Sequence, residues 1–348
     1  MRACFPAREF DSFAYLTWVE KKPKASRTHD EATLKARYYL PLVVDMNDFA
    51  ATSKIVRRAE ELGYYGIGIG EHYSSPGESN GRPDPFVVLS MLVPTTSRIH
   101  LGTMASSATV RHPAVLANTA LSLDALSGGR SFLCLGVGSG AETEYSSHGF
   151  RFITKPERLD AFEEALKIIS GLSRDRKGFS YRGRFYTLNG STLNLSDAFP
   201  QIWVGERKSR RLLELAGRYA DVINIHCANP AQAQAKLEIA REAAARAGRD
   251  REAVTPVLKH FVVMAGDEDS LVDELERSDG RKEGESKEEF VERMRRESPE
   301  AIIGTADEVQ DEYEKYAEAG FSEFSPIILP NSVGRIAERM EIFARRVA

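Results

Sequence analysis

The feature that most constrains the fold is a regular alternation of short apolar runs with amphipathic stretches, from Tyr38 to residue 346. The apolar runs are rich in β-branched and aromatic residues, as strands are, and at least one stretch of helical periodicity follows each. The predicted strands are 38–44, 64–70, 99–104, 131–138, 201–205, 221–225, 257–266 and 323–329. Strict alternation predicts a parallel sheet, and eight such units are the number that closes into a (β/α)8 TIM barrel. A doubly wound open sheet stays an alternative, because periodicity does not show closure.

Three segments depart from this rhythm. Residues 1–36 have little periodicity and predict an N-terminal extension, which leaves 37–348 as the barrel. The stretch "FSYRGRFYTLNGSTLN", 179–194, alternates aromatic and polar residues around glycines, as a hairpin does. Residues 266–300 are so rich in charge that they predict a solvated helical insertion or a mobile lid.

Composition excludes several classes of function. A net charge of −4 over 348 residues gives no bias toward nucleic acid or membrane surfaces. No run approaches the roughly 18 apolar residues of a membrane span, and no signal peptide is recognised, so we expect a cytoplasmic protein. Cys4, Cys134 and Cys227 are widely spaced, and the histidines show no metal-binding motif, so no metal site is indicated.

The ends of the predicted strands carry the candidate catalytic residues, Glu71 and His72. A parallel barrel builds its active site at the carboxyl ends of its strands, and "GIGIGEHY" ends there with an acid, an imidazole and the phenol of Tyr73. An imidazole titrates near neutral pH, which suits His72 to proton transfer. Side chains alternate along a strand, so Glu71 faces the other side, which favours a supporting role over a second reacting group.

Two further strand ends predict an anion site. Glycines in "GVGSG", 136–140, let the backbone approach a ligand closely, and "GERKSRR", 205–211, opens a helix with several cations and a serine. A helix amino terminus with that much positive charge would hold a phosphate. A solvated helix start is the alternative for the basic cluster.

At this point the sequence resembles the luciferase-like flavin and deazaflavin oxidoreductases. The resemblance rests on "SRIHLGT", "HPAVLAN", "LDALSGGR" and "LELAGRYAD", in that order and spacing, and runs from about residue 38 to 346. It implies a (β/α)8 barrel with the ring of FMN or of coenzyme F420 across the strand ends. His72 matches the histidine that faces the reactive edge of that ring, and Met104–Ala105 match a place where many members have a non-prolyl cis peptide.

The resemblance also implies which residues bind the coenzyme and the substrate. The coenzyme set is Thr103, Met104, Ala105, Gly138, Ser139, Gly140, Gly205, Glu206, Arg207, Lys208, Ser209 and Arg210. Candidates for the substrate side are Tyr73, Glu142 and His148. Glu71–His72 stands where many members that use F420 have Asp-His, and Ala141 stands where a subset of dehydrogenases has an acid, for which Glu142 or Glu144 could substitute.

The leading hypothesis is an F420-dependent oxidoreductase that transfers a hydride between the deazaflavin and a small organic substrate. The alternatives are an FMN-dependent monooxygenase that uses reduced flavin and O2, with a flavin or F420 reductase as partner, and a non-catalytic flavin-binding barrel. The resemblance further implies a homodimer through the helices that follow the second and third strands.

Overall fold

Eight parallel strands form a closed barrel in the computed structural model. They are β1 (Arg37–Leu42), β2 (Gly66–Ile69), β3 (His100–Ser107), β4 (Ser131–Gly136), β7 (Gln201–Glu206), β8 (Val222–His226), β9 (Thr255–Ala265) and β11 (Glu323–Leu329). The sheet runs from β9 through β11, β1, β2, β3, β4 and β7 to β8, and a further pairing of β8 with β9 closes it. The predicted (β/α)8 barrel is therefore confirmed, and the open sheet is excluded.

The structure describes residues 36–42, 49–74, 81–138, 142–151, 154–196, 198–206, 208–277, 280–282, 284–329 and 333–348. All of them belong to one compact unit, Lys35–Ala348. The expected N-terminal extension lies outside the described residues, except for Ala36.

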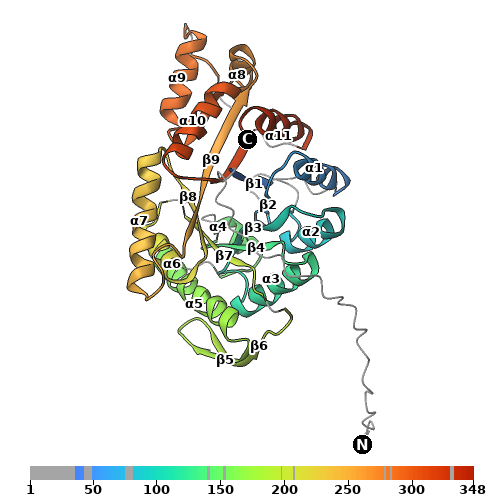
Figure 1. The fold of residues 1–348 in the computed structure, drawn as a ribbon, viewed down its shortest axis with the longest axis vertical. Coiled ribbons are helices and arrows are strands. Elements are labelled where there is room, and N and C mark those ends of the chain that lie inside the picture. Colours follow the sequence, from blue (N-terminus) through green and yellow to red (C-terminus); the bar gives the residue numbers. More distant parts are fainter. Residues whose placement is uncertain are drawn as a thin grey trace, which may run out of the picture. The chain divides into compact units, whose positions relative to one another are not determined.

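Helices surround the strands (Figure 1). Eight of them lie where the periodicity predicted a helix: α1 (Phe49–Glu61), α2 (Pro85–Leu92), α3 (Pro113–Ser127), α5 (Lys155–Arg174), α6 (Arg210–Tyr219), α7 (Pro230–Arg246), α10 (Ala306–Glu318) and α11 (Val333–Arg346). Their starts follow local chemistry, since Asp84 caps α2 and Thr154 with Glu157 forms a capping box on α5. The chain leaves α1 through Gly63, whose φ of +87° suits glycine.

The interior of the barrel is filled by aromatic rings rather than left open. Phe132 stacks on Trp203 with ring centroids 4.5 Å apart, and Tyr39 meets Trp203 edge-on at 4.8 Å. The glycines of "GIGIG" face this packing, because a Cβ at Gly66 would lie 2.5 Å from the Tyr39 ring. The strand is glycine-rich because bulky side chains from neighbouring strands take its space.

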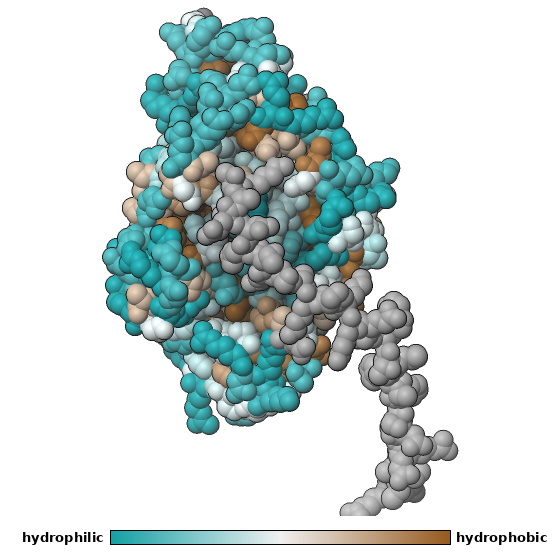
Figure 2. Space-filling view, in the orientation of Figure 1, coloured by the Kyte–Doolittle hydropathy of each residue, from teal (hydrophilic) through white to brown (hydrophobic). Residues whose placement is uncertain are grey.

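Both internal departures from the rhythm have clear structures. Strands β5 (Lys177–Arg182) and β6 (Thr187–Thr192) form the antiparallel hairpin that was predicted. The charged insertion contains α8 (Glu268–Leu275) and α9 (Lys287–Glu297), which share a small apolar cluster that includes Leu275 and Phe290. The region of α8, α9 and α10 presents a largely hydrophilic surface (Figures 1 and 2), so the charged segment is a solvated helical insertion.

Three short elements were not predicted. Helix α4 (Glu142–Ser147) follows β4, and the 3-10 turn η1 (Val93–Thr95) follows α2. Strand β10 (Ala301–Thr305) pairs in parallel with β9 outside the closed ring. Within the described ranges, no helix combines the length and the apolar character that crossing a membrane requires.

Candidate active site

A cavity of about 300 Å³ lies at the carboxyl ends of six barrel strands. Strands β2, β3, β4, β7, β8 and β9 and the first turn of α6 all contribute to it. The lining residues are Glu71, His72, Ala105, Ser106, Ser107, Gly136, Val137, Gly138, Gly205, Glu206, Leu212, Asn224, His226, Lys259 and Phe261. This is the end of a parallel barrel where active sites are built, and we call it the barrel cavity.

The wall of the barrel cavity is partly bare main chain. A Cβ at Gly205 would have no protein neighbour nearer than 3.7 Å, and one at Gly136 none nearer than 3.5 Å. Neither glycine has a positive φ, so backbone geometry does not require glycine at either position. The absence of side chains there keeps a smooth surface against which a flat ligand could pack.

Strand β3 contributes the cis peptide bond Met104–Ala105, at the position that the resemblance implied. Ala105 lines the cavity, whereas Met104 packs into the barrel interior and Thr103 donates a hydrogen bond to the Cys134 carbonyl at 3.0 Å. The buried Ser106 Oγ has no hydrogen-bond partner among the described residues, although Ser106 lines the cavity.

His72 stands at the edge of the barrel cavity, with 47% of its side chain exposed. Its Nδ1 lies 3.4 Å from Oε2 of Glu144, a carboxylate on α4 that is only 7% exposed. Oε1 of Glu144 accepts a hydrogen bond from the Tyr73 backbone N–H at 2.8 Å, which holds the carboxylate in place. A histidine paired with a buried carboxylate is the arrangement that orients an imidazole for proton transfer.

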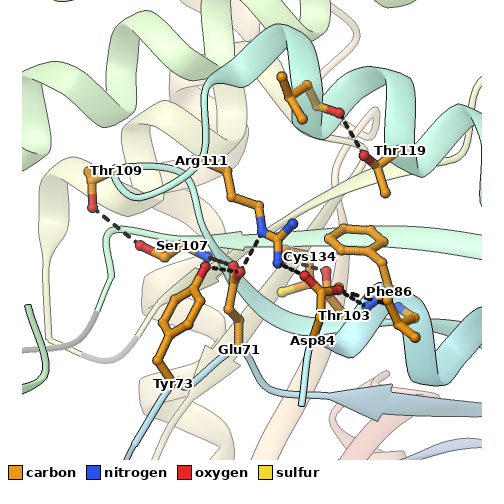
Figure 3. A network of polar contacts seen from close by, with 12 residues as sticks. Glu71, Tyr73, Asp84, Phe86, Thr103, Ser107, Thr109, Arg111, Thr119 and Cys134 are labelled. Atoms are coloured by element: carbon orange, nitrogen blue, oxygen red, sulfur yellow. Dashed lines mark hydrogen bonds and ion pairs between the residues drawn. The ribbon is translucent and has the colours of Figure 1, made fainter. Parts of the chain in front are cut away.

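The Glu71 carboxylate lies in a buried polar network (Figure 3). Its Oε1 contacts the Arg111 guanidinium and accepts a hydrogen bond from the Tyr73 hydroxyl at 3.0 Å, and its Oε2 accepts one from the Ser107 N–H at 2.8 Å. Arg111 also pairs with Asp84, the cap of α2. Both oxygens of Glu71 are thus engaged, by Tyr73 after β2, by the end of β3 and by Arg111 before α3, which favours the supporting role.

The three substrate candidates lie around α4. The Tyr73 hydroxyl is held by Glu71, and burial together with that carboxylate raises the Tyr73 pKa above its usual value. The Tyr73 ring packs edge-on against Phe150 at 4.8 Å and lies 5.6 Å from the His148 ring. Glu142 is exposed on the first turn of α4, so Glu144 is the acid that reaches His72. Neither Glu142 nor His148 lines the barrel cavity.

The predicted anion segment is only partly gathered at the cavity. Gly138 and Gly205 line it, and the cavity reaches Leu212 in the first turn of α6. Lys208 pairs instead with Glu300 at 3.3 Å, and Arg210 pairs with Glu214 along α6 at 3.1 Å. Ser139, Gly140 and Arg207 lie outside the described residues.

Glu206 is the unexpected member of that segment. Its side chain is fully buried, and it accepts hydrogen bonds from the Ser209 N–H at 2.7 Å and from Lys236 Nζ at 3.0 Å. The Glu206 carboxylate therefore accepts the hydrogen bond of one backbone N–H at the start of α6. We expected this residue to help hold the coenzyme, and the geometry gives it the task of fixing the turn before the helix.

Several lining residues were not on the list of candidates. Ser106, Lys259 and Phe261 belong to predicted strands or strand ends, but only the closed barrel shows which of their side chains turn inward. Nδ1 of His226 lies 3.2 Å from Oε2 of Glu300, and these two residues are far apart in the sequence. No group of three or more His, Cys, Asp or Glu residues is arranged to hold a metal ion in the described part of the chain.

Curated relatives match the chain over part of its length. The phthiodiolone/phenolphthiodiolone dimycocerosates ketoreductase of Mycobacterium tuberculosis is 34% identical over 185 residues, 52% of this chain and 47% of the relative. The 5,10-methylenetetrahydromethanopterin reductase of Methanolobus tindarius is 28% identical over 196 residues, 56% of each chain. The chain thus spans about half the length of the curated relatives it matches.

Solved structures match over nearly the whole barrel. An F420-dependent secondary alcohol dehydrogenase in complex with an F420–acetone adduct has a TM-score of 0.71 at 19% identity, with 90% of this chain and 98% of that one covered. Monooxygenase RslO1 from Streptomyces bottropensis also has a TM-score of 0.71, at 22% identity, with 89% and 98% covered. At these identities the likeness establishes the shared fold.

One protein family, described as luciferase-like monooxygenase, matches residues 24–323 of the chain. The match spans most of the chain, from before β1 into β11, and therefore includes every strand end that lines the barrel cavity. The chain belongs to the luciferase-like monooxygenase family.

Proposed function

We propose that this protein is an F420-dependent oxidoreductase that interconverts a small ketone and the corresponding secondary alcohol. The observation that carries the proposal is His72 at the edge of the barrel cavity with Glu144 behind it. Reduction of a carbonyl needs a hydride at carbon and a proton at oxygen, and a carboxylate-backed imidazole suits the proton half. The two curated relatives described above are named as a ketoreductase and a reductase, and one structural neighbour is a secondary alcohol dehydrogenase.

The residues of the barrel cavity fit a planar coenzyme. Gly136 and Gly205 present bare main chain to the ring, and the unpartnered Ser106 Oγ offers a hydrogen bond to a polar ring edge. A phosphate would be met at the start of α6, where Leu212 lines the cavity and the helix dipole favours an anion. When bound there, the deazaflavin would supply or accept the hydride.

The protein's own contribution would be orientation and proton transfer. With Nδ1 turned toward Glu144, Nε2 is the nitrogen of His72 left to exchange a proton with the substrate oxygen. Glu144 would stabilise the charged imidazolium before that proton is given up, and the Glu71 network would keep the end of β2 rigid. The redox chemistry itself belongs to the coenzyme.

An FMN-dependent monooxygenase is the second candidate. Monooxygenase RslO1 has the same TM-score as the alcohol dehydrogenase, and the Glu71–His72 pair resembles that of bacterial luciferase. In this case His72 would serve a reaction with O2, and the protein would depend on a reductase partner or on free reduced flavin.

We also propose that the protein is a homodimer. Large apolar side chains are exposed on two neighbouring helices, Val87 and Met91 on α2 and Val115 and Leu126 on α3, with exposures from 49% to 68%. Exposed apolar groups gathered on adjacent helices are typical of subunit interfaces.

A coenzyme screen tests the proposed function. The purified protein is titrated with F420 and with reduced and oxidised FMN, and binding is followed by fluorescence while an electrode records oxygen. We expect saturable F420 binding without oxygen uptake, followed by oxidation or reduction of members of a panel of secondary alcohols and ketones. Oxygen uptake with reduced FMN would favour the monooxygenase, coenzyme binding without turnover would favour the non-catalytic flavin-binding barrel, and failure to bind either coenzyme would contradict the proposed function.

Variants separate the role of His72 from general damage. His72→Ala should reduce turnover about 100-fold while the Kd for F420 changes little, because the imidazole acts on the proton. Glu144→Gln keeps the shape but loses the charge, and should reduce turnover by a smaller factor. His100→Gln is the matched control, because that imidazole begins β3 at the opposite end of the barrel and stacks on Tyr65. Equal losses in His72→Ala and His100→Gln would contradict the proposed role.

A further inference from the structure

A second cavity of about 350 Å³ lies outside the ring of eight strands, beside α10. We call it the outer cavity. The end of β8, β9, β10 with the turn before it, and α10 all contribute to its wall. The lining residues are Cys227, Ala228, His260, Arg295, Pro299, Glu300, Ala301, Ile302, Ile303, Glu308, Asp311, Glu312, Lys315 and Tyr316. None of them lines the barrel cavity, so the proposed redox chemistry does not account for this space.

The outer cavity contains a buried polar group without a protein partner. His260 is 1% exposed and its ring packs on that of Tyr316, with centroids 4.7 Å apart. Its Nε2 lies 3.5 Å from Cys227 Sγ, but its Nδ1 has no hydrogen-bond partner among the described residues. Burial lowers the pKa of His260 to about 3, so the ring is neutral at physiological pH. Leaving a buried polar atom unmatched is unfavourable, which indicates that the native occupant carries a polar group.

Charge at the outer cavity selects the sign of an occupant. Four carboxylates line it against two cations. Arg295 pairs with Glu308 at 2.8 Å, Lys315 with Glu312 at 2.6 Å, and Glu300 with Lys208 at 3.3 Å, so three of the four carboxylates are already matched. Asp311 is exposed on α10 and forms no ion pair with another described residue. The surplus of negative charge repels phosphate and carboxylate, so this cavity is not an extension of the coenzyme's anion site.

The remaining wall is apolar. Pro299, Ala301, Ile302 and Ile303 face the cavity from β10 and the turn that precedes it. An occupant therefore meets hydrocarbon on one side and carboxylates on the other, as a compact amine would require. Small-molecule sites have this composition, in which a few polar groups orient a largely apolar body.

We propose that the outer cavity binds a small organic ammonium ion. Its charge is met by Asp311, the unpartnered Nδ1 of His260 accepts a hydrogen bond from its N–H, and its hydrocarbon body packs against Pro299 and Ile302. The amine and the coenzyme have separate sites, because no residue is shared between the two cavities, although His226 of the barrel cavity lies 3.2 Å from Glu300 of the outer cavity.

Calorimetry with three probes of one shape tests the assignment. Benzylamine, benzyl alcohol and benzoate share a ring and differ in charge, and each is titrated into the full-length protein without coenzyme at low ionic strength. We expect saturable binding of benzylamine, at least about 10-fold tighter than that of benzyl alcohol, and none of benzoate. Because no coenzyme is added, the result stands apart from the success or failure of the proposed redox function.

Paired variants place the binding. Asp311→Asn should weaken benzylamine about 10-fold or more, and Ile302→Trp should abolish binding by filling the cavity. Glu318→Gln is the matched control, since it removes the same charge from the same helix away from the cavity. No saturable benzylamine binding, equal loss in Asp311→Asn and Glu318→Gln, or benzyl alcohol binding as tightly as the amine would overturn the proposal.

Discussion

Replacing Glu71 distinguishes a supporting carboxylate from a reacting one. The side chain has no exposed area, and it accepts hydrogen bonds from the Tyr73 hydroxyl and the Ser107 N–H while it pairs with Arg111. Truncation by Glu71→Ala removes all of these acceptors at once. It leaves Arg111 with Asp84 as its remaining carboxylate.

The expected loss follows from those contacts. Removing one partner of a buried ion pair lowers the free energy of unfolding by roughly 3–5 kcal/mol. The Tyr73 hydroxyl and the Ser107 N–H, which lose their acceptor, belong to the same network, so their losses do not simply add to this value. We expect the free energy of unfolding to drop by about 4 kcal/mol in Glu71→Ala. Glu71→Gln retains an oxygen acceptor but loses the charge opposite Arg111, and should lose about half as much.

Urea denaturation followed by circular dichroism measures both values, with unchanged m-values as a check on two-state unfolding. Glu142→Ala is the control, because that carboxylate is exposed on α4, and it should change stability by less than about 0.5 kcal/mol. Turnover of Glu71→Gln at saturating coenzyme should stay within about 10-fold of wild type. A variant as stable as wild type that binds coenzyme normally but does not turn over would refute the supporting role.

Three further outcomes are expected. Burial lowers the pKa of His260 to about 3, below its ordinary 6.5, so the unfolded chain takes up the proton first as pH falls. The contribution of the neutral imidazole to stability is complete above pH 6.5 and is lost as the pH falls toward 3. Between pH 7 and pH 5, the free energy of unfolding of wild type, measured by denaturation, should therefore fall by about 2 kcal/mol more than that of His260→Gln. Gly205→Ala adds a methyl group that lies at least 3.7 Å from the nearest neighbouring residue but enters the space proposed for the coenzyme ring. Titration should therefore give a Kd for F420 about 10-fold higher than that of wild type, whereas Gly280→Ala should leave the Kd unchanged. If the protein is a homodimer through α2 and α3, the double variant Met91→Glu with Leu126→Glu should elute as a monomer in size-exclusion chromatography with light scattering. A monomeric wild type would contradict the proposed dimer.

The order of the elements could be predicted because its signals are local. Alternation of apolar residues marks strands, helical spacing marks helices, and Pro, Gly and capping residues mark their ends, so all eight barrel strands were located. Strand β10 and helix α4 escaped prediction for different reasons: β10 directly follows the charged insertion, outside the strand–helix alternation, and the six residues of α4 make fewer than two helical turns. The position of the cis peptide at Met104–Ala105 came from the family resemblance, not from periodicity.

The sequence by itself therefore determined a (β/α)8 barrel and placed His72 at the carboxyl end of its second strand. Only the tertiary structure decided which groups meet there, because side chains from distant segments converge only when the barrel closes. Closure brings Glu144 to His72 across 72 positions of sequence, and it turns Glu71 toward Arg111. The fold likewise pairs Lys208, just before α6, with Glu300, in the turn before β10, so a basic run that looked like one anion site is divided among separate carboxylates.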